Sequence, residues 1–162
     1  MSLKTQVHAE DGLQTLTITR EFELPVELLY TAHTDGQIFE EWMSHEHGTV
    51  KLLKFEIRND GGWHFQNSDL QGNVVFQARG VFHTIIPNQK IIRTFEMVNT
   101  PFDTQLEFLE FEQLSEDISK LTMQIVYRSV ALRDQMVKLP FQQGLHMAHN
   151  RLQNVLSKLI KK

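Results

Sequence analysis

The chain has 162 residues, of which 41% are hydrophobic and 22% charged, as in an ordinary globular domain. Its net charge is −4 and no element collects Lys or Arg, which argues against a nucleic-acid partner. The lack of cysteine excludes disulfides and thiolate chemistry. No stretch approaches the roughly 20 apolar residues of a membrane span, and the N-terminus has no signal-peptide pattern. We expect a cytoplasmic protein with one domain, residues 13–162, after a loose lead-in over residues 1–12.

Taken in order, the chain predicts a strand, two short helices and then several more strands. The first strand covers residues 13–22, where Thr and β-branched residues are frequent. Pro25 opens a short helix that ends near His33, and the capping-box spacing from Thr34 to Gln37 starts a second helix that ends near Trp42. Gly, Asn and Pro turns then separate strands over residues 50–58, 63–67, 73–86, 90–98, 104–114 and 118–128. Short turns between consecutive strands indicate an antiparallel meander.

The last predicted element is a long helix over residues 141–160. Its apolar residues follow the three-and-four spacing of one helix face and are Phe141, Leu145, Ala148, Leu152, Val155, Leu156 and Leu159. A helix with one apolar face must bury it, and the preceding strands offer a sheet. The fold class predicted from these elements is α+β, with an antiparallel sheet packed against a C-terminal helix.

Several short motifs support a more specific assignment. They are Ile18–Pro25 with Glu27, Thr34-Asp35 before Glu41-Trp42, Gly61–Phe65, Gly80–Phe82, Ile85–Asn88, Thr94-Phe95, and Gln143-Gly144 before Arg151-Leu152. In this order and spacing they resemble the helix-grip fold of START domains, pollen-allergen relatives and polyketide cyclases. Within this fold, the local motifs look like those of one branch, the bacterial homologues of the activator of heat-shock-protein ATPase. Co-chaperone activity belongs to eukaryotic members with an additional domain and is not carried over.

This resemblance implies a curved antiparallel sheet of about six to seven strands wrapped round the C-terminal helix, with an apolar cavity between them. Trp63 and Phe65 share one strand face, and Ala78 and Gly80 are small enough to make room for a ligand or for close packing of the helix. Gly144 is open to the same two interpretations. The candidate ligand-binding residues are Trp42, Trp63, Phe65, Phe76, Arg93, Phe95, Met97, Met123, His146 and His149.

Arg93 is the most unusual of these candidates, because it shares a strand face with Ile91, Phe95 and Met97. An unpaired guanidinium there would be costly to bury. It could anchor a ligand carboxylate or phosphate through its two-pronged donors. Alternatively it pairs with an internal acid, Glu107 or Glu110, or a bulge turns it outward.

The histidines offer weaker signals. His146 or His149 could reach the cavity as a polar handle or a general base, although no carboxylate partner is evident. His45-Glu46-His47 looks like a metal-binding fragment, but zinc needs a third ligand such as His64 or His149, and we expect no metal and no cofactor.

We therefore expect the chain to bind an apolar or amphipathic small molecule rather than to catalyse a reaction. Two alternatives stay open. One is a cyclase, aldolase or hydrolase that uses His and Arg in the cavity. The other is an interaction protein, such as a homodimer or a chaperone partner, that uses the two short helices and the His45 loop.

Overall fold

A computed structural model gives the structure of residues 3–160, which form one antiparallel sheet and four helices. The strands are β1 (Gln6–His8), β2 (Thr15–Phe22), β3 (Thr49–Phe55), β4 (Gly62–Ser68), β5 (Val74–Ile86), β6 (Lys90–Met97), β7 (Thr104–Ser115) and β8 (Ile118–Val126). The helices are α1 (Val26–Thr34), α2 (Gly36–Met43), α3 (Val130–Val137) and α4 (Phe141–Ile160). Among these residues, no helix is long and apolar enough to cross a membrane.

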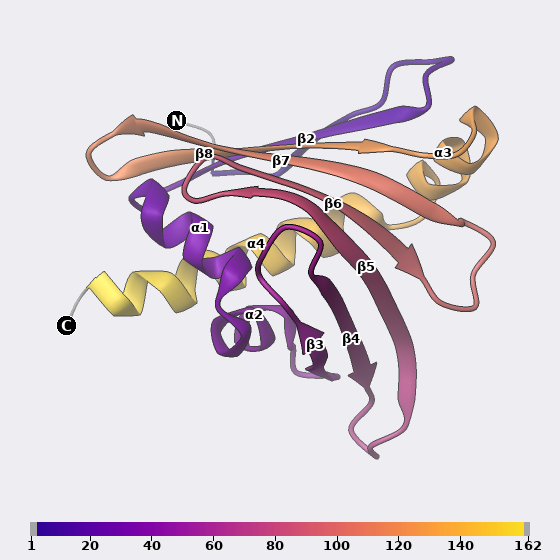
Figure 1. The fold of residues 1–162 in the computed structure, drawn as a ribbon, viewed down its shortest axis with the longest axis horizontal. Coiled ribbons are helices and arrows are strands. Elements are labelled where there is room, and N and C mark those ends of the chain that lie inside the picture. Colours follow the sequence, from indigo (N-terminus) through magenta and orange to yellow (C-terminus); the bar gives the residue numbers. More distant parts are fainter. Residues whose placement is uncertain (1–2, 161–162) are drawn as a thin grey trace.

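The strand order across the sheet is β1-β2-β8-β7-β6-β5-β4-β3. Consecutive strands from β3 to β8 are neighbours, as the predicted meander requires, and β2 closes the sheet against β8. Figure 1 shows the sheet curving so that α1, α2 and α4 lie on its concave side. Register shifts interrupt the ladders between β3 and β4, β4 and β5, and β5 and β6, and such bulges bend strands. The predicted α+β helix-grip architecture is confirmed.

The core divides into two clusters on this concave side. The larger one includes Phe39 and Trp42 of α2, Trp63 and Phe65 of β4, and Leu152 of α4. The smaller one is formed by Leu16, Ile18, Ile125, Tyr127 and Met136, with Phe141 and Leu145 packed against it. Helix α4 therefore contributes its C-terminal half to one cluster and its first turns to the other.

Local signals explain most element boundaries. Helix α4 has the predicted bounds, although Leu159, assigned to its apolar face, is 40% exposed. Helix α2 begins one residue later than predicted, because the side chain of Asp35, not Thr34, accepts the hydrogen bond from the Ile38 amide. On β8, Leu121 and Ile125 are buried as the alternation predicted.

Two elements were not predicted. Residues 1–12 were expected to be a loose lead-in, but Gln6–His8 pair with β2 and raise the strand number to eight, while residues 1–2 lie outside the described part. Helix α3 escaped prediction because its buried positions are Arg133 and Met136, which give no apolar stripe. Arg133 Nη1 donates to the carbonyl oxygens of Glu10 and Thr15, which ties α3 to the N-terminal segment.

Candidate functional site

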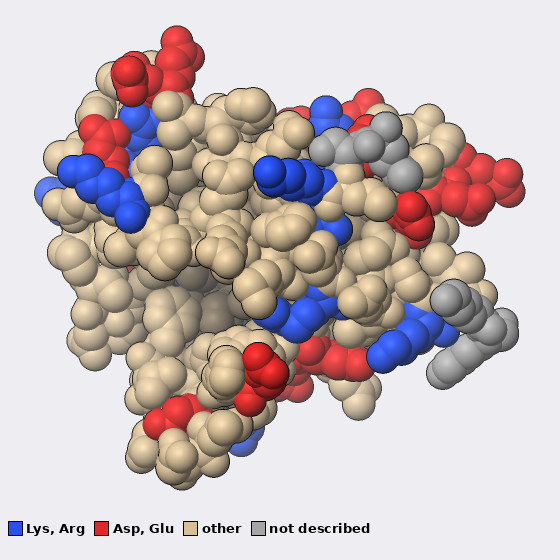
Figure 2. Space-filling view, turned by 180° about the vertical axis from the view of Figure 1, so that it is seen from behind, with Lys and Arg blue, Asp and Glu red and all other residues tan. Residues whose placement is uncertain are grey.

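A pocket of about 530 Å³ lies between the sheet and the first half of α4. Its walls include residues of both core clusters, so it reaches the interior, while the exposed lining residues Pro140 and Gly144 show that it is also open to solvent. Pro140, Phe141 and Gly144, where the chain enters α4, are among its lining residues. Figure 2 shows a hollow in one face of the molecule, bordered mainly by residues other than Lys, Arg, Asp and Glu. The volume is within the range of small-molecule sites.

Aromatic rings form much of the wall. Trp63 lies 5.8 Å from Phe65 and 5.7 Å from Phe95, measured between ring centroids. Phe65 in turn lies 6.1 Å from Phe76. Because β4, β5 and β6 are adjacent strands, their inward residues meet in one continuous aromatic surface.

The small residues near this wall have different roles. A Cβ on Gly80 would lie 1.9 Å from the Thr94 carbonyl oxygen and 2.5 Å from Trp63 Nε1, which donates to that same oxygen. Gly80 therefore permits close packing rather than making room for a ligand. A Cβ on Gly144 would meet nothing within 4 Å, and Gly144 lines the pocket.

The polar part of the wall is a hydrogen-bonded trio on β6 and β7. Arg93 lies directly opposite Glu107, and its Nε donates to Glu107 Oε1 over 2.8 Å. The Gln105 amide nitrogen donates to the other carboxylate oxygen, also over 2.8 Å. Arg93 Cζ lies 4.3 Å from the Trp63 ring centre, a cation–π contact. The prediction that Arg93 pairs with an internal acid is confirmed, and the acid is Glu107.

Two buried polar atoms of pocket-lining residues have no hydrogen-bond partner among residues 3–160. They are Gln105 Oε1 and the Tyr127 hydroxyl, which are buried and belong to pocket-lining residues. Burial raises the pKa of Tyr127, and the negative charge of Glu107 raises it further, while Arg133 opposes this. The hydroxyl is therefore protonated at neutral pH and can both donate and accept.

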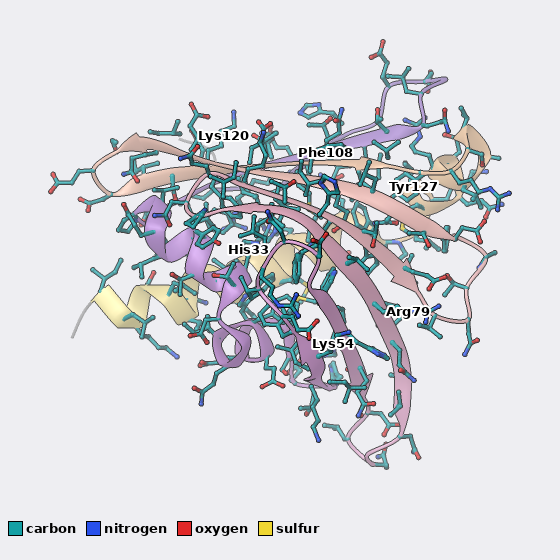
Figure 3. All side chains as sticks on the ribbon, viewed as in Figure 1. His33, Lys54, Arg79, Phe108, Lys120 and Tyr127 are labelled. Atoms are coloured by element: carbon teal, nitrogen blue, oxygen red, sulfur yellow. The ribbon has the colours of Figure 1, made fainter. Side chains whose placement is uncertain are left out.

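Two buried histidines line the pocket from the helix side. His33 Nδ1 donates to the Leu29 carbonyl oxygen over 2.9 Å, which leaves Nε2 as an acceptor. Burial lowers the pKa of His33 to about 4, the bond to Leu29 partly offsets this, and the charge of Arg93 lowers it further. Burial also holds the pKa of His149 well below its ordinary value. Figure 3 labels His33, which belongs to α1, and Tyr127, which directly follows β8.

The N-terminal segment supports this side of the pocket. The Thr5 side chain bonds His149 Nδ1 over 2.8 Å, and the Thr5 amide donates to His146 Nδ1 over 3.2 Å. Arg20 is 3% exposed and donates to the side chain of Asn150 over 2.8 Å. The contacts of Thr5 thus fix the ring of His149, which faces the pocket.

Of the ten candidate residues, nine line the pocket and His146 does not. His146 instead contacts Thr5 and Arg20 at the edge of α4. His45 lies at the pocket rim, while residues 3–160 contain no group of three metal-binding side chains. His47 and Glu46 contact each other on the surface.

Sequence reasoning missed several lining residues that carry polar groups, namely His33, Gln105, Tyr127 and Arg151. Gln105 and Tyr127 share the inward face of their strands, so the alternation that placed Ile125 inside also pointed to Tyr127. His33 had no such signal, because it is one buried polar residue on a short helix. Arg151 Nε donates to the Trp42 carbonyl oxygen over 2.9 Å and joins α4 to α2.

Solved structures with the same fold cover nearly the whole chain. A Rhodobacter sphaeroides protein has a TM-score of 0.87 at 17% identity, with 96% of this chain and 99% of that chain covered. A Mycobacterium smegmatis protein has a TM-score of 0.83 at 17% identity, with 94% and 96% covered. CalU16 from Micromonospora echinospora has a TM-score of 0.61 at 17% identity, with 98% and 88% covered.

At these identities the likeness concerns the fold alone. Comparison with curated proteins gives no match. The sequence profile described as "Activator of Hsp90 ATPase homolog 1-like protein" matches residues 23–157, which span α1 to most of α4 and include nearly all of the pocket wall. The chain therefore belongs to the family of Activator of Hsp90 ATPase homolog 1-like proteins.

Proposed function

We propose that this chain binds an apolar small molecule in the pocket between the sheet and the first half of α4. One observation carries the proposal: a pocket of about 530 Å³ next to the core combines a largely aromatic wall with a few polar side chains, among them Arg93, Gln105 and His149. Concave, mostly apolar sites with a few convergent polar groups are typical of small-molecule binding.

Packing energetics favour an occupant. Protein interiors are normally close-packed, and the lining of an empty space loses dispersion contacts on one side. Here the aromatic rings of Trp63, Phe65 and Phe95 face such a space. An apolar ligand would restore those contacts and remove the rings from water, at about 25 cal/mol per Å² of apolar surface.

The polar side chains of the pocket lining are better suited to binding a ligand than to catalysing a reaction. Both carboxylate oxygens of Glu107 are engaged, by Arg93 and Gln105, so this acid is not available as a general base. Among the described residues, the pocket lining holds no Ser, Thr or Cys that could act as a nucleophile. The groups present can orient a ligand.

The test is native mass spectrometry of the protein purified gently from its own host, followed by denaturing release of any bound molecule. We expect a stoichiometric small molecule on the wild type. Gly144→Phe should abolish it, because a side chain at this position has open space and lies at the pocket. Gly144→Ala is the matched control and should retain the ligand. A wild type without any small molecule, or equal retention by Gly144→Phe, would contradict the proposal.

A further inference from the structure

We infer, on the basis of the proposed binding function, that the ligand carries an uncharged carbonyl group and that Arg93 bonds this group inside the pocket. Such a ligand is a ketone, an aldehyde, an ester or an amide with an apolar body. Three features of the wall support this assignment: the free donors of Arg93, the groups that cover its other sides, and the charge of Glu107.

The guanidinium of Arg93 has donors that no other residue uses. Its Nε donates to Glu107 Oε1, whereas Nη1 and Nη2 donate to no atom of residues 3–160. Five completely buried side-chain atoms in this part of the chain lack a hydrogen-bond partner, and neither Nη nitrogen of Arg93 is one of them. Because both nitrogens are unpartnered and yet not completely buried, both retain accessible surface.

This accessible surface faces the pocket. Arg93 lines the pocket and is only 7% exposed. It lies on β6 between Phe82 of β5 and Glu107 of β7, its partners in the two neighbouring strands, and both of these residues are buried. With buried neighbours on both sides along the sheet, the guanidinium meets open space on the pocket side. A ligand in the pocket can therefore contact its Nη nitrogens.

The other sides of the guanidinium are already covered. Its Cζ lies 4.3 Å from the centre of the Trp63 ring, so one face of the planar group rests on the indole. The Nε edge is occupied by Glu107. The edge formed by Nη1 and Nη2 remains, and this rigid pair of donors suits an oxygen acceptor.

An uncharged acceptor is favoured over a carboxylate. Glu107 already balances the charge of Arg93, and its two oxygens are bonded by Arg93 and Gln105. A ligand carboxylate at the Nη edge would bury a second negative charge beside the same guanidinium, and burying a charge without its own partner is costly. A carbonyl oxygen accepts hydrogen bonds without adding a charge or a proton that needs an acceptor. A hydrocarbon would leave the donors unpaired.

The apolar body of such a ligand has a surface to rest on next to Arg93. Phe95 follows Arg93 by two residues on β6, so the two side chains share one face of the strand. The ring of Phe95 lies 5.7 Å from that of Trp63, and both rings line the pocket. A flat ring that carries a ketone is therefore a suitable probe of this site.

The test uses acetophenone, isopropylbenzene and benzoate, which carry a ketone, a hydrocarbon and a carboxylate of similar shape on one benzene ring. Two-dimensional NMR titration at pH 7 measures their dissociation constants for the wild type and for Arg93→Met/Glu107→Gln, which removes the donors together with both charges. We expect the preference for acetophenone over isopropylbenzene to fall at least about 10-fold in this variant, the effect of a hydrogen bond from a charged donor.

Arg79→Met/Glu96→Gln is the matched control, because this arginine–glutamate pair is exposed and lies outside the pocket lining. It should leave the preference unchanged. A second measurement needs no variant: the carbon-13 signal of the acetophenone carbonyl should move downfield on binding to the wild type, relative to acetophenone in cyclohexane, because a charged donor polarises the C=O bond.

The other outcomes overturn the inference in distinguishable ways. A preference that Arg93→Met/Glu107→Gln does not change, or a carbonyl signal that does not move downfield, contradicts the contact with Arg93 while the binding function stands. Benzoate that binds most tightly and loses most in this variant contradicts the uncharged group. If no probe binds, the molecule released from the host protein decides: an uncharged carbonyl in it supports the inference, its absence contradicts the inference alone, and an empty protein contradicts the proposed function as well.

Discussion

Arg93 and Glu107 face each other across β6 and β7 as a buried ion pair, with 2.8 Å between Arg93 Nε and Glu107 Oε1. A second pair, Arg79 and Glu96, has the same atoms in contact over 2.6 Å between β5 and β6, but Arg79 is 64% exposed. These two arginine–glutamate pairs thus have nearly the same geometry, but one is buried and the other is exposed.

This difference predicts the effect of removing each acid. Glu107→Gln should lower the free energy of unfolding by about 3–5 kcal/mol, because it leaves the guanidinium of Arg93 buried without a countercharge. Glu96→Gln should lower it by no more than about 1 kcal/mol, because water screens the exposed pair. Urea unfolding at pH 7 measures both. Similar losses for the two variants would show that burial does not set the strength of these pairs.

Replacing either of two glycines by alanine should change the free energy of unfolding, in opposite directions for the two positions. Gly144→Ala should raise the free energy of unfolding by up to about 1 kcal/mol, because Gly is unfavourable inside a helix and the new Cβ meets no atom. Gly80→Ala should be strongly destabilising, because its Cβ would collide with the Thr94 carbonyl oxygen. Thermal unfolding of both variants against wild type checks the signs. A destabilised Gly144→Ala would contradict the open space that the structure shows around this position.

The lowered pKa of His33 leads us to expect that the folded protein loses stability in mild acid. Its pKa is lowered from an ordinary value of 6.5 to about 4, so between these values the unfolded chain binds a proton that the folded chain does not. Stability should therefore fall as the pH drops from about 6.5 to 4, by about 3 kcal/mol from this residue. Urea unfolding at steps of pH should show a shallower fall for His33→Gln. His83→Gln, a change at an exposed position, should keep the wild-type slope.

The hydrogen bond between Thr5 and His149 leads us to expect that the N-terminal segment stabilises the pocket wall. Thr5→Val keeps the shape of the side chain but removes the hydroxyl that bonds the buried Nδ1 of His149. We expect a loss of about 1–3 kcal/mol in the free energy of unfolding, the cost of an unpaired buried polar group. Thr17→Val, on the outer side of β2, serves as the control and should change stability little. An equal effect of both substitutions would argue against the role given to Thr5.

The sequence by itself determined the order of all elements except β1 and α3, the bounds of α4 and the inward face of β8. These depend on local periods of 3.6 and 2 residues and on turn residues, which the printed sequence contains. It also placed Arg93 on an apolar face and named Glu107 and Glu110 as candidate partners, because a buried arginine is usually paired with an acid.

Only the tertiary structure decided which polar groups meet in the pocket. Periodicity tells which side of a strand a residue occupies, but not how deep it lies or what faces it. The hydrogen-bonded group of Arg93, Glu107 and Gln105 therefore emerged only from the pairing of β6 and β7. Helix rotation likewise placed His149 inside and His146 at the edge, although both flank the same apolar stripe. Strand β1 and helix α3 depend on long-range contacts of Thr5 and Arg133, which no local pattern records.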